Sequence, residues 1–174
     1  MVTCNAALSA CQKGARWHEA MSVLRNMQLR TLKPNVVTCS AGISTCEKSS
    51  RWHEALRMLA DMRLRRLGPD VIAFSAAISA CEKGTRWHEA LGMFADMLLR
   101  RLSPNEITYT ALIGACDKGA RWHDVLALWS DMRLRDLAPS VSVFNAASCA
   151  CEKGGGTRPW ACLRTGGCAP WSWM

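Results

Sequence analysis

The most constraining feature of the chain is one short motif that recurs at a fixed interval. Arg-Trp-His-Glu-Ala-Leu, or a near copy, places a tryptophan every 35 residues without insertion or deletion, at Trp17, Trp52, Trp87 and Trp122. A period of about 20 to 50 residues is typical of solenoids, whose units bury their apolar faces only against their neighbours. The chain therefore folds as an array of small units, without a single central core.

Further columns of identical residues keep the same register. They are the cysteines Cys11, Cys46, Cys81, Cys116 and Cys151, the lysines Lys13, Lys48, Lys83, Lys118 and Lys153, the methionines Met27, Met62, Met97 and Met132, and the prolines Pro34, Pro69, Pro104 and Pro139. The array has full units at 1–35, 36–70, 71–105 and 106–140 and a partial unit at 141–153, which exceeds the minimum of about three units that a stable array needs.

Each unit has the pattern of a helical hairpin. In the third unit, the apolar spacing from Phe74 to Cys81 predicts a first helix over residues 73–83, and the stripe from Trp87 to Met97 predicts a second helix. Gly84, between them, is expected to adopt a left-handed conformation at the end of the first helix. The predicted fold is all-α, an α-solenoid of stacked hairpins.

The charge of the chain favours a polyanionic partner. The formal net charge is +8, and it falls from +4 in residues 1–35 to −1 in residues 106–140. Electrostatic attraction is therefore expected to be strongest at the amino end. No apolar run approaches the length of a membrane span, and the sequence contains no recognisable signal or transit peptide.

Of the ten cysteines, those that recur in register are read as buried free thiols. Five form one column, and Cys4 and Cys39 share another column with Phe74, Tyr109 and Phe144, which marks a core position. Cysteine in such positions behaves as a small hydrophobe in a reducing compartment. Disulfides, the alternative in a short secreted chain, are not expected.

The unit resembles the pentatricopeptide repeat. It has Val-Val-Thr-Cys-Ser or Glu-Ile-Thr-Tyr-Thr at its start, Glu-Ala-Leu near its middle, Asp-Met late and Leu-x-Pro-Asp/Asn at its end. The match covers residues 1–140 fully and 141–153 partially, whereas the tetratricopeptide repeat has about 34 residues and a different motif. One departure is the family's late-loop glycine, which is replaced by Thr31, Arg66, Arg101 and Asp136, so the second helices are expected to run longer.

The resemblance implies a right-handed superhelix whose first helices line a concave groove for single-stranded RNA, with one base per repeat. The family's base-reading positions map onto Asn5 with Asn35, Ser40 with Asp70, Ser75 with Asn105, Thr110 with Ser140, and the unpaired Asn145. Aspartate accepts hydrogen bonds, as the N–H edge of G or U requires, whereas an asparagine amide can donate to A or C. With the family's tendencies, the predicted tract is pyrimidine (C better than U), G, A and a weakly defined purine, 5′ to 3′. The other reading of the Asn5 column is exposed polar residues or helix caps.

Two more columns acquire roles from the resemblance. The aliphatic residues Val2, Val37, Ile72 and Ile107 occupy the positions that sandwich each base, and Ser142 breaks this column. Their alternative role is an apolar first turn packed on the neighbouring repeat. Lysines 13, 48, 83, 118 and 153 are expected to follow successive phosphates, or to complement the dipoles of the helices they end. These lysines form a ladder along the stack, and acidic residues directly before four of them partly neutralise its charge.

No catalytic or metal site is expected, and no cofactor. His18, His53, His88 and His123 form a column, but a zinc site needs about four converging ligands and His-Glu-Ala-Leu lacks the second histidine of a zincin motif. After Lys153 the register ends, and residues 154–174 are expected to form a disordered or loosely packed tail.

The sequence thus predicts a non-enzymatic, single-stranded RNA-binding module acting in RNA metabolism of mitochondria or chloroplasts, with possible protein partners, no membrane association and no small-molecule substrate. Editing, splicing or other processing, stabilisation and translation are not distinguished. The alternative function is a helical-repeat scaffold that binds a peptide or protein in the same groove.

Overall fold

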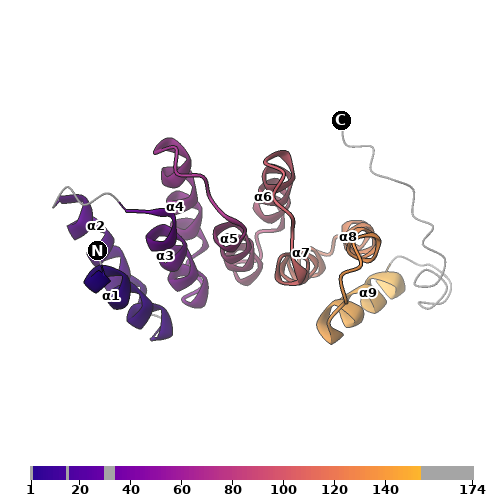
Figure 1. The fold of residues 1–174 in the computed structure, drawn as a ribbon. Coiled ribbons are helices and arrows are strands. Elements are labelled where there is room, and N and C mark those ends of the chain that lie inside the picture. Colours follow the sequence, from indigo (N-terminus) through magenta and orange to yellow (C-terminus); the bar gives the residue numbers. More distant parts are fainter. Residues whose placement is uncertain (1, 15, 30–33, 154–174) are drawn as a thin grey trace.

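The computed structural model describes residues 2–14, 16–29 and 34–153, with side chains for residues 7–14, 16–27 and 34–150. Within these residues the predicted all-α solenoid is confirmed (Figure 1). The helices are α1 (Val2–Lys13), α2 (Trp17–Leu29), α3 (Val36–Lys48), α4 (Trp52–Leu64), α5 (Val71–Lys83), α6 (Trp87–Leu99), α7 (Glu106–Lys118), α8 (Trp122–Leu134) and α9 (Val141–Lys153). The predicted tail and the side chains of Val2, Asn5 and Lys153 lie outside the described residues.

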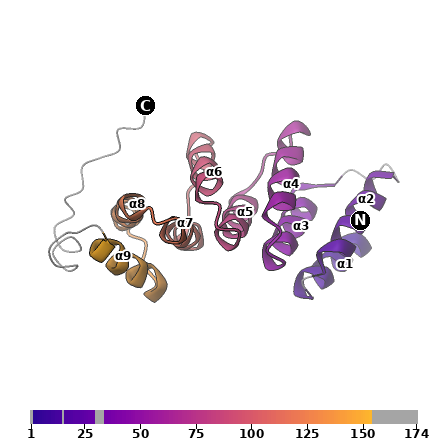
Figure 2. The same ribbon diagram turned by 180° about the vertical axis from the view of Figure 1, so that it is seen from behind.

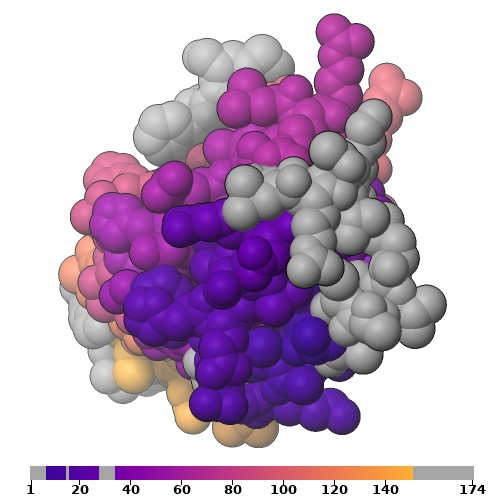
Figure 3. All heavy atoms as spheres, turned by 90° about the vertical axis from the view of Figure 1, so that its left-hand side faces the viewer, coloured from indigo at the N-terminus to yellow at the C-terminus, as the bar shows by residue number. Residues whose placement is uncertain are grey.

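The helices form two rows with different packing. Each first helix contacts its own second helix and also the first helices of the adjacent units, as in the series α1, α3, α5, α7, α9. Each second helix contacts the first helix of the following unit. Successive second helices lie farther apart, although Arg63 of α4 reaches Asp96 of α6 through an ion pair at 3.1 Å. The first helices are therefore the closely spaced row. They form the inner side of the arch in Figures 1 and 2, and Figure 3 looks along the stack from its amino end.

The first helices begin at capping residues. Oδ1 of Asn35, Asp70 and Asn105 accepts the backbone N–H three residues later at 2.8, 2.8 and 2.9 Å, respectively. Such a cap satisfies one of the four N–H groups that a helix leaves unpaired at its start. The last residue of each of these units therefore also begins the next first helix.

The expected left-handed conformation of Gly84 is wrong. Its φ is −85°, and the left-handed residue is Thr85, with φ 55°. The reason for glycine here is a close contact, since a Cβ on Gly84 would lie 2.3 Å from Cδ1 of Trp52. A Cβ on Gly119 would likewise lie 2.4 Å from Cδ1 of Trp87. The glycine lets the tryptophan of the preceding repeat pack against the end of the first helix.

The expected extension of the second helices is also wrong. They end at Leu64, Leu99 and Leu134, and the residues in place of the family glycine, Arg66, Arg101 and Asp136, have φ of 56°, 57° and 54°. The left-handed turn persists because the next residue closes it, as when Leu67 N–H donates to the Met62 carbonyl at 2.9 Å. Leu67 is also packed against the core, which completes this type of helix end.

The cysteine and methionine columns lie in the core wherever their side chains are described, which excludes Cys151. Cys11, Cys46, Cys81 and Cys116 are buried free thiols, as predicted, and Met62, Met97 and Met132 are fully buried. Burial raises the pKa of Cys46 to about 11 and the pKa of Cys81 and Cys116 to about 12. These thiols are protonated at neutral pH and fill space between stacked helices.

The tryptophan column joins successive repeats. The guanidinium groups of Arg51, Arg86 and Arg121 lie 4.0, 4.5 and 4.4 Å from the ring centres of the tryptophan one repeat earlier. The other partner is the adjacent histidine, whose ring lies 3.2 to 3.5 Å from the indole centre in each unit. The histidine column thus packs against tryptophan. In the described part of the chain no cluster of three His, Cys, Asp or Glu residues is suited to a metal ion.

Candidate nucleic-acid interface

The predicted RNA-contacting columns share one side of each first helix. In α3, Val37, Ser40 and Lys48 are spaced i, i+3 and i+11, which places them along a single face at about 3.6 residues per turn. The buried residues Ile43 and Cys46 lie on the opposite face, toward the second helix. Because the second helices form the outer row, the face that carries the predicted residues points to the inner side of the arch.

The aliphatic column is exposed on this face. The side chains of Val37, Ile72 and Ile107 are 64%, 62% and 63% exposed. Their alternative role, packing on the neighbouring repeat, is therefore wrong. Isolated exposed apolar residues are ordinary, but three in register on one groove form a surface that water solvates poorly. In α9 the corresponding residue is the polar Ser142, which is also exposed.

The structure brings Ser40 and Asp70 together across the boundary between two repeats. The single hydroxyl proton of Ser40 is shared between two acceptors, since Oγ lies 3.1 Å from Asp70 Oδ1 and 2.8 Å from the Val36 carbonyl oxygen. Asp70 Oδ1 also accepts the N–H of Ala73 at 2.8 Å. Since both bonds use Oδ1, Oδ2 is the carboxylate oxygen left to accept a hydrogen bond from a ligand.

The capping asparagines are oriented by a threonine three residues later. Asn105 Oδ1 accepts the N–H and the hydroxyl of Thr108 at 2.9 and 2.8 Å, and Asn35 Oδ1 accepts both groups of Thr38 at 2.8 and 2.6 Å. The amide oxygen is thereby occupied, and the NH₂ group, a donor, is left for a ligand. Ser75 joins this network through a 2.8 Å hydrogen bond to Thr108.

The serines of the reading columns are less exposed than the sequence suggests. Ser40 and Ser75 are each 5% exposed, so they are neither exposed polar residues nor caps, contrary to that alternative. Thr110 and Ser140 line one pocket, together with Ile107, Ser79 and Ser142, between α5, α7 and the start of α9. The fourth predicted pair is therefore also brought together. Asn145 is exposed on α9.

Two lysines of the ladder form ion pairs with the preceding repeat. Lys83 Nζ lies 2.8 Å from Glu47 Oε1 and 3.2 Å from the Glu47 carbonyl. Lys118 Nζ makes the same pair of contacts with Glu82, at 3.0 and 3.2 Å. The position that would pair with Lys48 is occupied by the neutral Gln12, and no described carboxylate pairs with Lys48. Lys13 and Lys48 are exposed at the amino end, where the chain is most basic.

The orienting threonines and the capping role of the unit-end residues are absent from the sequence-based assignment. The signal is present in the spacing, since an asparagine followed three residues later by threonine suits a reciprocal cap, which Asn105 and Thr108 form. Ala73 stands in place of the threonine after Asp70, which lets Ser40 reach that carboxylate directly.

No helix in the described residues has both the length and the apolar character required to cross a bilayer. A comparison with curated protein sequences finds no match. Solved structures do resemble the chain. The pentatricopeptide repeat protein PPR10 from maize matches with a TM-score of 0.74 and 20% identity over 89% of this chain. PPR10 in complex with an 18-nt psaJ RNA element matches with a TM-score of 0.71 and 20% identity over 88% of this chain.

The present chain spans 22% of the length of PPR10. A third similar structure is the PPR domain of Arabidopsis thaliana protein-only RNase P 1 in complex with tRNA, with a TM-score of 0.77, 11% identity and coverage of 85% of this chain and 78% of that one.

Models of repeat families match most of the sequence. The pentatricopeptide repeat domain matches residues 1–49 and 22–84, the PPR repeat family matches residues 69–118, and the PPR repeat matches residues 107–137. These matches cover the repeats whose stacked hairpins form the arch. The chain therefore belongs to the pentatricopeptide repeat family.

Proposed function

We propose that the chain is a non-enzymatic module that binds single-stranded RNA along the inner side of the arch, with one base per repeat. The observation that carries the proposal is the exposed column of Val37, Ile72 and Ile107 on the face that also holds the reading residues. The solved structures of PPR10 with an RNA element and of the RNase P domain with tRNA add support from proteins of the same fold.

The exposed aliphatic side chains suit the faces of bases. A base between Ile72 and Ile107 would cover apolar surface that is now in water, which stabilises the complex without depending on base identity. Base identity would then be read by the polar groups that the caps leave unused. Asp70 presents an acceptor, and Asn35 and Asn105 present donors.

These groups support the tract pyrimidine (C better than U), G, A and a weakly defined purine from the amino end. The pair of Ser40 and Asp70 favours G, since Asp70 can accept from its N1–H. At the fourth position, the hydroxyls of Thr110 and Ser140 can donate or accept, so they discriminate weakly. A fifth base is poorly held, because Ser142 takes the place of the aliphatic residue.

Binding should be weak and dependent on salt. Four stacked bases at about 1–3 kcal/mol each must offset the ordering of the RNA, which favours a micromolar dissociation constant. Neutralising about four phosphates gives a slope of log K against log salt near −3. By extension from the family, we place the activity in mitochondrial or chloroplast RNA processing, editing, stability or translation.

The test compares Ile72→Ala with Leu99→Ala in anisotropy titrations of a short RNA that contains the tract. Both side chains are exposed, at 62% and 83%, so either substitution should change folding stability by no more than about 0.5 kcal/mol. Leu99 lies at the end of a second helix, away from the inner face. We expect Ile72→Ala to weaken binding about tenfold, from the lost contact with a base, and Leu99→Ala to leave it unchanged.

Equal effects of the two substitutions would contradict the proposed groove. If wild type shows no affinity for single-stranded RNA but retains a protein or peptide on the same face, the scaffold function replaces this one. A selection from random RNA would identify the preferred tract directly.

A further inference from the structure

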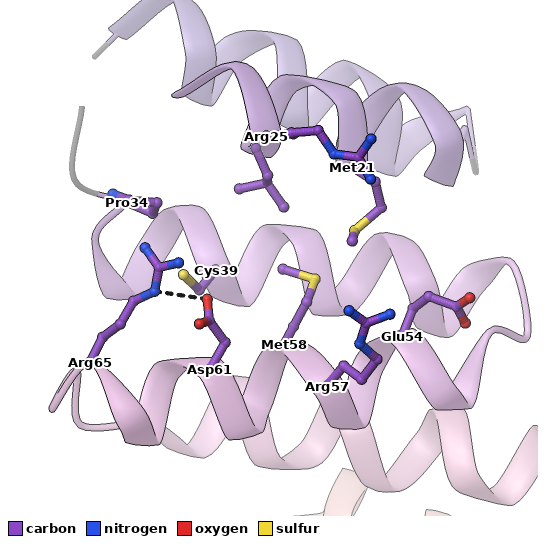
Figure 4. A pocket seen from close by; sticks show the side chains of 10 residues that line it. Met21, Arg25, Pro34, Cys39, Glu54, Arg57, Met58, Asp61 and Arg65 are labelled. Atoms are coloured by element: carbon purple, nitrogen blue, oxygen red, sulfur yellow. Dashed lines mark ion pairs between the residues drawn. The ribbon is translucent and has the colours of Figure 1, made fainter. Parts of the chain in front are cut away.

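A pocket lies on the outer side of the junction between the first two repeats (Figure 4). It is bounded by α2, α3 and α4, with Met21, Leu24 and Met58 as apolar walls and Cys39 on α3. Charged side chains complete it: Arg25, Glu54, Arg57, Asp61 and Arg65. None of the residues proposed to contact RNA lines this pocket.

The pocket is open because a small side chain occupies a position that is aromatic in later repeats. Cys39 shares its register position with Phe74 and Tyr109, both of which are fully buried. Tyr109 packs edge-on against Phe94, with the ring centres 5.5 Å apart, and so fills the equivalent space between α6, α7 and α8. The space at Cys39 therefore lies where the later repeats place a buried aromatic ring.

The same pocket carries positive charge that the equivalent sites lack. Arg25 corresponds to Ala60 and Ala95 one and two repeats later, and Arg57 corresponds to Gly92 and Ala127. No described carboxylate forms an ion pair with Arg25 or Arg57, whereas Arg65 is held by Asp61 at 2.8 Å. Two unpaired guanidinium groups beside an apolar hollow favour an occupant with negative charge next to its apolar part.

The equivalent site at Tyr109 also indicates which polar group would pair with a ring bound at Cys39. The Tyr109 hydroxyl donates a hydrogen bond to Oδ2 of Asp131, and Asp61 holds the register position of Asp131 in the open pocket. A phenol that entered at Cys39 would find a carboxylate in the corresponding place. A ring without a hydroxyl could not donate to the Asp61 carboxylate, which would then pair with Arg65 alone.

From these three observations we propose that the pocket binds a tyrosine side chain of a partner polypeptide, flanked by acidic residues. The ring occupies the space left by Cys39, its hydroxyl donates to Asp61, and the neighbouring carboxylates pair with Arg25 and Arg57. A polypeptide is the source because the equivalent spaces in this chain are filled by polypeptide side chains. The site would tether a protein to the outer face and leave the inner face free.

The experiment is isothermal titration calorimetry of the full chain with the acetylated, amidated peptide Asp-Glu-Tyr-Glu-Asp. We expect a measurable affinity that falls about tenfold when phenylalanine replaces tyrosine, because the hydrogen bond to Asp61 is lost. Lysines in place of the acidic residues should abolish binding. The free compound 4-hydroxyphenylacetate should bind far more weakly than the peptide.

Two variants test the pocket itself. Cys39→Phe restores the ring seen at Phe74, so it should remove peptide binding while the helical circular dichroism is kept. If that variant fails to fold, the double variant Arg25→Ala with Arg57→Ala, which changes only exposed side chains, should weaken peptide binding about tenfold. Phe74→Cys is the matched control, since it opens the equivalent space without the two arginines and should create no peptide site.

Unchanged peptide binding in folded Cys39→Phe or in the double arginine variant would overturn the proposal. So would equal binding of the tyrosine, phenylalanine and lysine peptides. If 4-hydroxyphenylacetate bound as tightly as the peptide, the pocket would serve a small molecule and the partner polypeptide would be wrong. RNA affinity should be the same in all these variants, so failure here leaves the inner-face function to be tested separately.

Discussion

Ser40 and Asp70, which the family resemblance assigns to one base, are joined by a 3.1 Å hydrogen bond between Oγ and Oδ1. The bond crosses from one repeat to the next and shares its acceptor atom with the cap of α5. It therefore fixes the carboxylate with one oxygen turned to the protein and one left for a base. The same residue that stabilises the stack thus presents the group proposed to read the RNA.

Changing Asp70 to asparagine should move the preference at the second nucleotide from G toward A. The capped oxygen stays in place, and the free oxygen becomes an amide donor suited to the bare N1 of adenine. A reversed preference is worth about 1–2 kcal/mol, within the usual effect of an unmatched polar group. Titrations against four RNAs that differ only at this nucleotide measure it, and an unchanged ranking would exclude Asp70 as a specificity residue.

The stability of Asp70→Asn provides its control, because asparagine caps a helix about as well as aspartate. The thermal midpoint should be close to that of wild type. Asp70→Ala, by contrast, loses the bond to the Ala73 N–H and should lower the free energy of unfolding by about 0.5–2 kcal/mol.

Lys48 and Lys83 should contribute unequally to RNA binding. Lys83 is engaged by Glu47, whereas Gln12 leaves Lys48 without a described carboxylate partner. Lys48→Ala should reduce the slope of log K against log salt by about 1, and Lys83→Ala should reduce it by less. Titrations at several salt concentrations give both slopes. A larger reduction for Lys83→Ala would show that its ion pair opens when RNA binds.

Glycine at the left-handed turn residues should stabilise the fold. Thr85 and Arg101 have φ of 55° and 57°, a conformation that costs a non-glycine residue about 1–2 kcal/mol. Glycine removes this conformational cost, but its greater chain entropy in the unfolded state offsets part of the gain. Arg101→Gly should therefore add about 0.5–1 kcal/mol to the free energy of unfolding. Chemical denaturation measures the change.

Gly84→Ala should act in the opposite direction, although Gly84 directly precedes one of these turns. Its Cβ would meet the Trp52 ring, which must move away from the helix end. The loss should be about 1–3 kcal/mol, as for other overpacked sites. Gly92→Ala is the matched control, because a Cβ there meets nothing within 4 Å and alanine favours the helix.

The buried thiols make the fold sensitive to alkali. The pKa of Cys81 is raised from 9.0 to about 12 by burial, so an unfolded chain releases this proton at lower pH than the folded chain. The contribution to stability is complete below pH 9 and is lost as pH rises toward 12. Cys81→Ala should flatten the decline in denaturation midpoint above pH 9. A decline of the same steepness would mean that other groups cause it.

The array, the helical hairpin and the family could all be predicted from the sequence. The tryptophan column and the apolar stripes recur with one period, and each stripe is a local property of about ten residues. The family resemblance assigned Ser40, Asp70 and Ile72 to the RNA-contacting groove, and the structure brings Ser40 and Asp70 within hydrogen-bonding distance.

The contacts between units, by contrast, follow from tertiary packing. The left-handed turn falls on Thr85, whereas Gly84 gives room for the close approach of Trp52, which joins residues more than 30 positions apart. Lys83 pairs with Glu47 and not with the adjacent Glu82 because stacking brings two helix ends together. The pocket at Cys39 forms where α2, α3 and α4 meet, because the small thiol leaves open the space that the buried rings of Phe74 and Tyr109 fill in later repeats. These contacts depend on the distance and angle between packed repeats, which no residue spacing along the chain encodes.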